Sequence, residues 1–266
     1  MTSAPGTLAV LAGLGAADMA LLVVAGLVAG AVNAAAGGGS LISFPALLAV
    51  GYPSIAANVT NAVALLPGYL GGSLAYRAEL EGQRPRVRAL GVTSAVGAVA
   101  GAALLISTSQ GVFDVLVPFL ILAGCALLAA QPVISRRVRP PASGPHAHRS
   151  VALHAGTFAA SVYGGYFGAG LGIMLLAVLA LALDDSLHRL NALKGLLSLV
   201  VSLASVAYFA VFGPVEWGAA AIMAVAAFAG GNLGVALARR LPPEVLRKVV
   251  VAFGVVVALW LLIKQA

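Results

Sequence analysis

The chain is a series of apolar runs separated by short polar connections. A helix needs roughly 20 apolar residues to cross a bilayer, and most of the runs approach or exceed that length. The pattern predicts helices at residues 8–36, 41–50, 55–76, 89–106, 112–134, 151–167, 171–183, 190–212, 217–238 and 245–263. Two of these runs, 41–50 and 171–183, are too short to cross, and each directly follows a cluster of glycines.

The composition agrees with an all-α polytopic membrane protein. Of the 266 residues, 61% are hydrophobic and 9% are charged, and the mean hydropathy is +1.05. A soluble domain carries about 25% charged residues. The net charge of +7 comes from residues scattered over short connections, which favours positive-inside topology over nucleic-acid binding. The expected surroundings are therefore the lipid bilayer, and we expect no nucleic-acid partner.

The basic residues predict which connections face the cytoplasm. Four connections carry them, and by the positive-inside rule all four should lie on that side. They contain Arg77, Arg84, Arg86 and Arg88; Arg136, Arg137, Arg139 and Arg149; Arg189 with Lys194; and Arg239, Arg240, Arg247 and Lys248. The connections 51–54, 107–111 and 213–216 carry no Lys or Arg. Residues 151–183 must then leave the cytoplasm and return, which predicts a broken hairpin, and residues 8–50 fit the same pattern on the opposite side.

The two halves of the chain share spaced motifs, which predicts an internal repeat. Three pairs of motifs recur about 130 residues apart, as expected for a duplicated unit. They are Gly37–Gly39 with Gly168–Gly170, Asn58-x-x-Asn61 with Asn191-x-x-Lys194, and Gly97-x-x-x-Gly101 with Gly230-x-x-x-Gly234. The expected units are residues 1–134 and 151–266, joined by a cytoplasmic linker at 135–150. Each would hold a broken or re-entrant hairpin and three transmembrane helices. Three crossings between copies make the repeats inverted, which is typical of secondary transporters.

The two glycine breaks are the strongest candidates for an anion site. Backbone amides at the start of a helix carry the positive end of the helix dipole and bind anions. Helices starting at Ser40 and near Leu171 would aim those amides at the breaks. The candidate residues here are Gly37, Gly38, Gly39, Ser40, Gly168, Gly170 and Gly172. The alternative is that the glycines only allow close helix packing, which is our interpretation of the Gly-x-x-x-Gly motifs.

Polar residues at the start of two later helices extend this candidate site. They are Asn58, Thr60, Asn61, Asn191 and Lys194, and the weaker candidates Asn33 and Tyr163 complete the set. Ser198, Ser202 and Ser205 continue the Lys194 face at helical spacing. Helix capping is an alternative for Asn58 and Asn191. Lys194 is the best single candidate for an anion ligand, although at about 9 Å into its helix it could also snorkel to the interface.

The sequence offers no support for catalysis. Gly37-Gly-Gly is not followed by Gly-Lys-Ser/Thr, so it is not a P-loop. No acid lies clearly inside a span, but Asp18 interrupts the first apolar run, so a proton relay is left as an alternative. Cys125 fits a packing role, and His146 with His148 in the Pro-rich linker fits solvation better than metal binding. We therefore expect neither an enzyme nor a cofactor or metal. Residues 1–7 lack the charged start of a signal peptide, so the first apolar run should be retained.

Taken together, these motifs resemble the sulfite exporter TauE/SafE family, also called TSUP. In the first half the matching segments are 32–45, 57–61 and 66–68, and in the second half they are 163–172, 184–185, 188–194 and 239–242. The resemblance implies a bacterial plasma-membrane permease for sulfur-containing or organic anions such as sulfite, sulfoacetate or thiosulfate. Ala169 replaces the middle glycine of the second glycine motif.

These observations predict a carrier that moves a small anion by alternating access. An inside-negative potential contributes about 2.3 kcal/mol per charge per 100 mV and drives anions outward, so export needs no coupling ion. The alternatives are an anion channel and a membrane assembly subunit that transports nothing. The chemical identity of the anion, the direction of transport and the oligomeric state are left open by the sequence.

Overall fold

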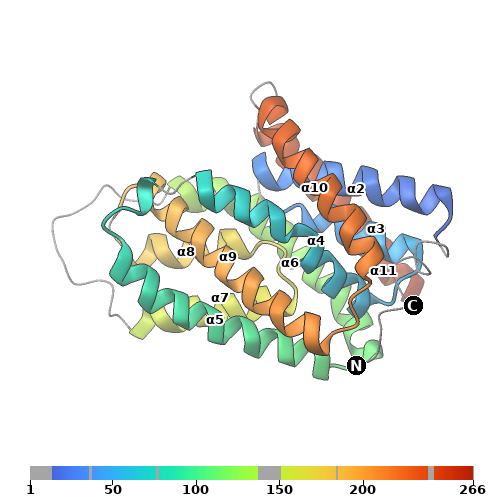
Figure 1. Cartoon of the computed structure of the whole chain (residues 1–266), viewed down its shortest axis with the longest axis horizontal. Helices are drawn as coiled ribbons and strands as arrows, with labels where there is room; N and C mark the ends of the chain where they lie inside the picture. Colours follow the sequence, from blue (N-terminus) through green and yellow to red (C-terminus); the bar gives the residue numbers. More distant parts are fainter. Residues whose placement is uncertain are drawn as a thin grey trace, which may run out of the picture.

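The protein is described by a computed structural model covering residues 14–35, 38–75, 78–136, 151–183, 185–238 and 243–265. Within these residues the fold is all-helical and contains no strand (Figure 1). The helices are α2 (Ala16–Ala35), α3 (Ser40–Val50), α4 (Ser54–Ala75), η1 (Ala78–Leu80), α5 (Arg84–Ser107), α6 (Gln110–Arg136), α7 (Val151–Tyr166), α8 (Leu171–Ala182), α9 (Leu187–Phe212), α10 (Trp217–Ala238) and α11 (Pro243–Gln265).

Several helices have the length and composition of membrane spans. Among the described residues, α2, α5, α6, α9 and α11 are long and apolar enough to cross a bilayer. Large apolar side chains cover their outer faces, including Val92, Phe119 and Val256, which are all more than half exposed. Such a surface is suited to lipid and not to water. The prediction of an all-α membrane protein is confirmed at this level.

The two predicted short helices are present. The helix α3 has 11 residues and α8 has 12, so they are about 16 and 18 Å long and cannot cross about 30 Å of hydrocarbon. Before α3 the chain breaks around Gly38, which has φ of 92°, and before α8 it breaks around Gly168 and Gly170, with φ of 81° and 82°. Only glycine adopts this left-handed conformation without strain, so the glycines end one helix and redirect the next.

Bare glycine faces bring two helix pairs into backbone contact. A Cβ on Gly30 of α2 would lie 2.0 Å from the carbonyl oxygen of Ala227 in α10, and one on Gly230 would lie 2.0 Å from that of Leu27. A Cβ on Gly101 of α5 would lie 2.0 Å from the carbonyl oxygen of Val162 in α7. These distances confirm close packing for Gly97, Gly101 and Gly230, as is typical of small residues in membrane helices.

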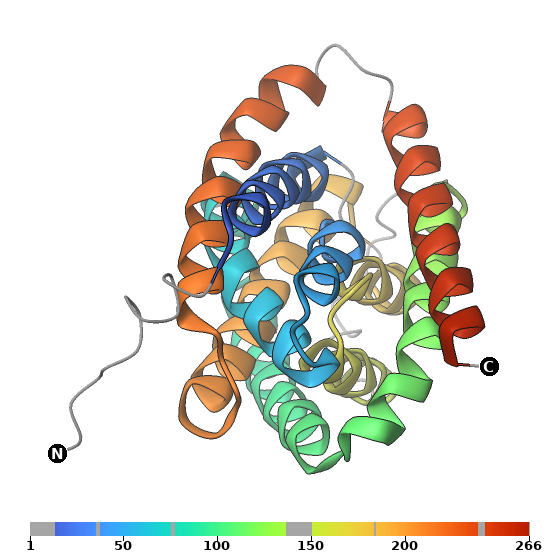
Figure 2. The ribbon, with the colours of Figure 1, turned by 90° about the vertical axis from the view of Figure 1, so that its right-hand side faces the viewer.

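The remaining helices pack around a central crossing of α4 and α9. In Figure 2, α2 lies against α10 on one side of the molecule and α6 lies against α11 on the other. The two broken hairpins also touch, because Phe44 of α3 packs edge-on against Phe167 in the second break with ring centroids 5.5 Å apart. Both rings are almost fully buried, so the breaks lie inside the helix bundle.

Two clusters that contain charged residues lie at opposite ends of the bundle. At one end, the arginine end, Asp185 bonds Arg86 at 2.6 Å and Arg189 at 3.0 Å. The helix α5 begins there with Pro85 in its first turn, a position where proline is tolerated. At the opposite end, Gln110 Nε2 donates to Asp114 Oδ1 at 2.9 Å, and Ser54 Oγ donates to the same oxygen.

Candidate functional site

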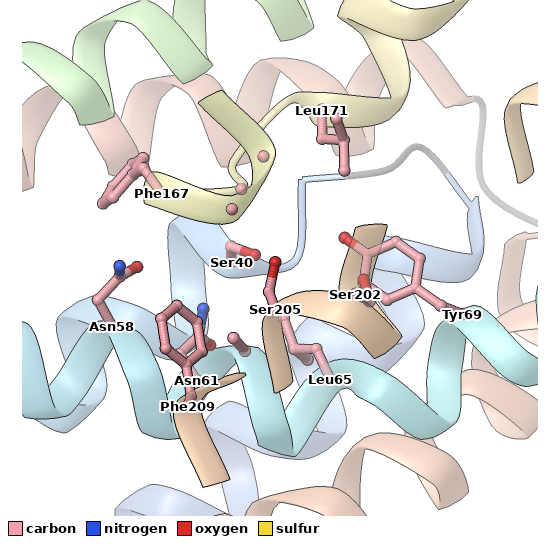
Figure 3. A pocket seen from close by; sticks show the side chains of 14 residues that line it. Ser40, Asn58, Asn61, Leu65, Tyr69, Phe167, Leu171, Ser202, Ser205 and Phe209 are labelled. Atoms are coloured by element: carbon pink, nitrogen blue, oxygen red, sulfur yellow. The ribbon is translucent and has the colours of Figure 1, made fainter. Parts of the chain in front are cut away.

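A small cavity with several polar side chains in its wall lies where the two halves of the chain meet. Its volume of about 30 Å³ is enough for a water molecule. Its wall is formed by the start of α3, one face of α4, the break between α7 and α8, and one face of α9 (Figure 3). The polar side chains in the wall are Ser40, Asn58, Asn61, Tyr69, Ser202 and Ser205. We call this the central cavity.

The first half contributes Ser40 and two asparagines that lie one turn apart on α4. Asn58 and Asn61 are each only 3% exposed. Ser43 of α3 bonds the Oδ1 atom of Asn61, which ties the first turn of α3 to α4. Because this bond engages the amide oxygen, the NH₂ group of Asn61 is the donor available to the cavity.

The second half contributes the break at Gly168 and two serines of α9. Figure 3 shows the hydroxyl groups of Ser40 and Ser205 facing one another across the central cavity. Ser205 is 2% exposed, and its Oγ atom has no hydrogen-bond partner within the described part of the chain. A buried hydroxyl without a partner costs about 1–3 kcal/mol, so its place in this wall calls for a bound polar group.

Some predicted site residues position the breaks without lining the cavity. The Tyr163 hydroxyl donates to the carbonyl oxygen of Ala169 at 2.8 Å and so spans the second break. Gly38 and Gly170 pack on α6, where their Cβ atoms would lie 3.2 Å from Leu128 and 3.1 Å from Leu127.

Three further predicted residues also lie outside the cavity wall. A Cβ on Gly39 would lie 2.3 Å from the Ala29 carbonyl oxygen and 3.0 Å from Cβ of Asn33, so both residues belong to the contact between α2 and α3. Thr60 Oγ1 accepts a hydrogen bond from the Glu216 amide at 3.0 Å, which holds the connection before α10. Gly37, Asp184, His146 and His148 lie outside the described residues.

The other predicted ligands form a separate group, which we call the Lys194 cluster. Lys194 Nζ donates to Asn191 Oδ1 at 3.1 Å. A Cβ on Gly172 would lie 3.7 Å from Lys194 Cδ and 3.9 Å from Ser198 Oγ. Ser198 is 3% exposed, and its hydroxyl also lacks a partner among the described residues. The cluster comprises Gly172, Asn191, Lys194 and Ser198.

Helix capping was the alternative role for Asn58 and Asn191, and the structure gives a different answer for each. Ser186 caps α9, because its side chain accepts from the Arg189 amide, so Asn191 is not the cap. Asn58 lies inside α4, and its Nδ2 atom donates to the carbonyl oxygen of Tyr166, the last residue of α7. Asn58 therefore caps the end of another helix.

Several cavity residues were not among the candidate site residues predicted from the sequence. Ser202 and Ser205 lie on the predicted polar stripe of α9, so their helical spacing was the available signal. Tyr69, Phe167 and Phe209 complete the wall. Nothing in their local sequence separates them from ordinary packing residues.

Comparisons with known proteins agree with this architecture. The family described as "Sulfite exporter TauE/SafE" matches residues 22–261. A "Probable membrane transporter protein" of Haemophilus influenzae is 30% identical over 234 residues, which cover 88% of this chain and 90% of that protein. A "Probable membrane transporter protein ORF9" of Sinorhizobium sp is 25% identical over 248 residues, 92% of each chain. No solved structure matches the chain.

Proposed function

Because the chain belongs to the sulfite exporter TauE/SafE family of membrane transporters, we propose that it exports small sulfur-containing or organic anions such as sulfite, sulfoacetate or thiosulfate. One observation carries the proposal. Two interrupted helices, one from each half of the chain, contribute Ser40 and Gly168 to one cavity that also holds buried asparagine and serine side chains. Broken helices inside a bilayer normally expose their backbone groups to a substrate.

The groups in the central cavity suit an anion. Its polar side chains are hydroxyls and amides set among apolar residues, and no carboxylate lines it among the described residues. The NH₂ group of Asn61 and the hydroxyl of Ser205 can each donate a hydrogen bond, and α3 begins at Ser40 with the positive end of its dipole. Neutral donors of this kind hold a small oxyanion without the full cost of burying an opposite charge.

The arrangement of helices supports alternating access by two inverted repeats, residues 1–134 and 151–266. If each helix is replaced by its counterpart in the other half, the contact between α2 and α10 becomes the contact between α7 and α5. The contact between α4 and α9 and the contact between α6 and α11 are each unchanged by this exchange. The central cavity lies beside the α4–α9 crossing, where rocking of one repeat against the other would open it to either side. In this scheme, the linker at 135–150 joins the repeats.

We place the arginine end in the cytoplasm of a bacterial inner membrane. Arg84, Arg86, Arg88 and Arg189 lie at that end, as the positive-inside rule requires. An inside-negative potential then favours movement of an anion toward the opposite end by about 2.3 kcal/mol per charge per 100 mV. Export is therefore the direction that needs no coupling ion.

The test is saturable anion flux by the purified protein in liposomes. Radiolabelled sulfite, thiosulfate and sulfoacetate are compared with acetate, and each is tested for counterflow against the unlabelled anion. We expect saturation and counterflow with at least one sulfur anion, and loss of both in Asn61→Ala. Conductance without saturation would identify a channel instead. Absence of flux for every anion, in protein that remains folded, would remove the transport proposal.

A further inference from the structure

We propose that the Lys194 cluster is a second anion subsite, separate from the central cavity and nearer the arginine end. It would bind the same small oxyanion before the anion reaches Ser205 or after it leaves. This inference rests on the proposed function, because it assigns an additional station on the same transport path.

Lys194 is a basic residue of α9 that forms no ion pair with a carboxylate of the described residues. Among the described residues, both ion pairs of the protein involve Asp185, and neither includes Lys194. Its ammonium has three N–H donors, and one of them bonds Asn191 Oδ1. A charged side chain within a membrane helix usually pairs with an opposite charge or marks the path of an ion. An anionic substrate would supply the missing charge.

The start of α8 lies beside Lys194 and holds one backbone amide that is not used within the break. Leu171, Ile173 and Met174 donate their amides to carbonyl oxygens in the break, whereas the Gly172 amide has no backbone partner among the described residues. Gly172 turns its bare Cα toward Lys194 and Ser198, at the distances given above. A side chain at this position would lie against the methylene groups of Lys194 and the hydroxyl of Ser198.

Ser198 supplies the independent sign of a ligand. Its hydroxyl is buried, has no partner among the described residues, and lies beside this same space. The Gly172 amide, the Lys194 ammonium and the Ser198 hydroxyl therefore belong to adjoining parts of two helices, α8 and α9. A backbone amide, a hydroxyl and an ammonium are the groups that bind small oxyanions in proteins.

The second subsite lies along the same polar stripe as the central cavity. Ser198 and Ser205 are seven residues apart on α9, which corresponds to about 10 Å. Ser202 lies between them and lines the cavity. From the arginine end toward the opposite end, α9 therefore presents Lys194, Ser198, Ser202 and Ser205 in that order.

The internal repeat gives the two sites different chemistry. Asn61 and Lys194 are each the fourth residue of the repeated motif, which is Asn-x-x-Asn in the first half and Asn-x-x-Lys in the second. Asn61 contacts α3 through Ser43, and Lys194 approaches α8 at Gly172. The neutral member belongs to the central cavity and the charged member to the second subsite. A charged site on the cytoplasmic side would capture a dilute anion, and the neutral cavity would release it more readily.

Gly172→Ala is the sharpest test, because the fold tolerates it and the proposed subsite does not. The added Cβ would make ordinary contacts of 3.7 to 3.9 Å, and alanine is the better helix former. We therefore expect its unfolding temperature to stay at or above that of the native protein. Gly91→Ala is the matched control, because a Cβ there meets nothing within 4 Å.

Sulfite, thiosulfate and sulfoacetate uptake is measured in right-side-out and inside-out membrane vesicles, which present opposite faces of the protein. At the arginine end we expect Gly172→Ala, Lys194→Gln and Ser198→Ala to raise the half-saturating concentration about tenfold or more. At the opposite end the half-saturating concentration should change by less than about twofold. Gly91→Ala should match the native protein at both faces.

Two results would overturn the second subsite while leaving the proposed function intact. An equal rise in the half-saturating concentration at both faces would mean that Lys194 belongs to one site shared with the central cavity. No change at either face, in variants with native unfolding temperatures, would make it a snorkelling residue. Failure of the proposed function looks different, because the native protein itself would then show no saturable flux of any of the three anions.

Discussion

The Nδ2 atom of Asn58 donates a 2.8 Å hydrogen bond to the carbonyl oxygen of Tyr166. Asn58 belongs to α4 in the first half of the chain, and Tyr166 is the last residue of α7 in the second. The last carbonyls of a helix have no partner within that helix. The bond therefore satisfies the end of α7 and fixes the second break against α4, beside the central cavity.

Asn58→Ala should destabilise the protein and impair transport together. Removing the amide leaves the Tyr166 carbonyl without its donor, which costs about 1–3 kcal/mol. The measurement is the unfolding temperature in detergent, followed by flux in liposomes. Thr93→Ala serves as the control, because Thr93 bonds only within its own helix and should change stability by less than about 0.5 kcal/mol. Equal effects of the two substitutions would contradict the bridging role.

Ser205→Ala should separate transport from stability. The Ser205 hydroxyl is buried without a partner among the described residues, so its removal should leave the free energy of unfolding unchanged or raise it by up to about 1 kcal/mol. Transport should fall, because the hydroxyl faces Ser40 across the cavity (Figure 3). Ser107→Ala, at the end of α5, is the control for loss of a serine hydroxyl. Native flux in Ser205→Ala would remove Ser205 from the anion site.

The breaks could be predicted from the sequence because their signals are local. A glycine cluster followed by an apolar run too short to cross predicted both α3 and α8, and the helical spacing of serines predicted the polar face of α9. In each case the relevant residues are neighbours along one segment. The predicted close approach at Gly97, Gly101 and Gly230 followed from residue size alone.

The division of the candidate site into two groups could not be predicted in the same way. Asn61 and Lys194 occupy matching places in the repeated motif, which favoured one shared site. Their separation depends on the antiparallel crossing of α4 and α9, in which Val59 near the start of α4 lies beside Gly213 at the end of α9. The spacing within either helix carries no information about that crossing.

Gly30→Ala and Gly101→Ala should destabilise the fold to a similar degree, because each disturbs a contact between the two halves of the chain. In each variant the new Cβ would lie 2.0 Å from a backbone carbonyl oxygen of the neighbouring helix, so the helices must move apart. Overpacking of this kind costs about 1–3 kcal/mol or more. Unfolding temperatures are compared with that of Gly91→Ala, whose Cβ has free space. If all three variants were equally stable, the contacts of α2 with α10 and of α5 with α7 would not be close.

Asp185→Asn should release the ion cluster that joins α5 to the start of α9. Burial raises the pKa of Asp185, but hydrogen bonds from Arg86, the Ser186 amide and Arg189, together with the charge of Arg189, hold it below its usual value. The folded pKa therefore lies below the unfolded pKa. The stabilising contribution is complete above the unfolded pKa and is lost as the pH falls through the folded pKa.

The loss of stability in Asp185→Asn should therefore be the same at every pH between about 5 and 8. Two partly exposed ion pairs together contribute about 1–2 kcal/mol, and below about pH 4 the native protein should lose this advantage too. The measurement is the difference in unfolding temperature between native and variant protein, followed from below about pH 4 up to about pH 8. The exposed Glu244→Gln is the control for loss of one negative charge. A difference that changed between about pH 5.5 and 7 would mean that another titrating group, and not Asp185, controls the cluster.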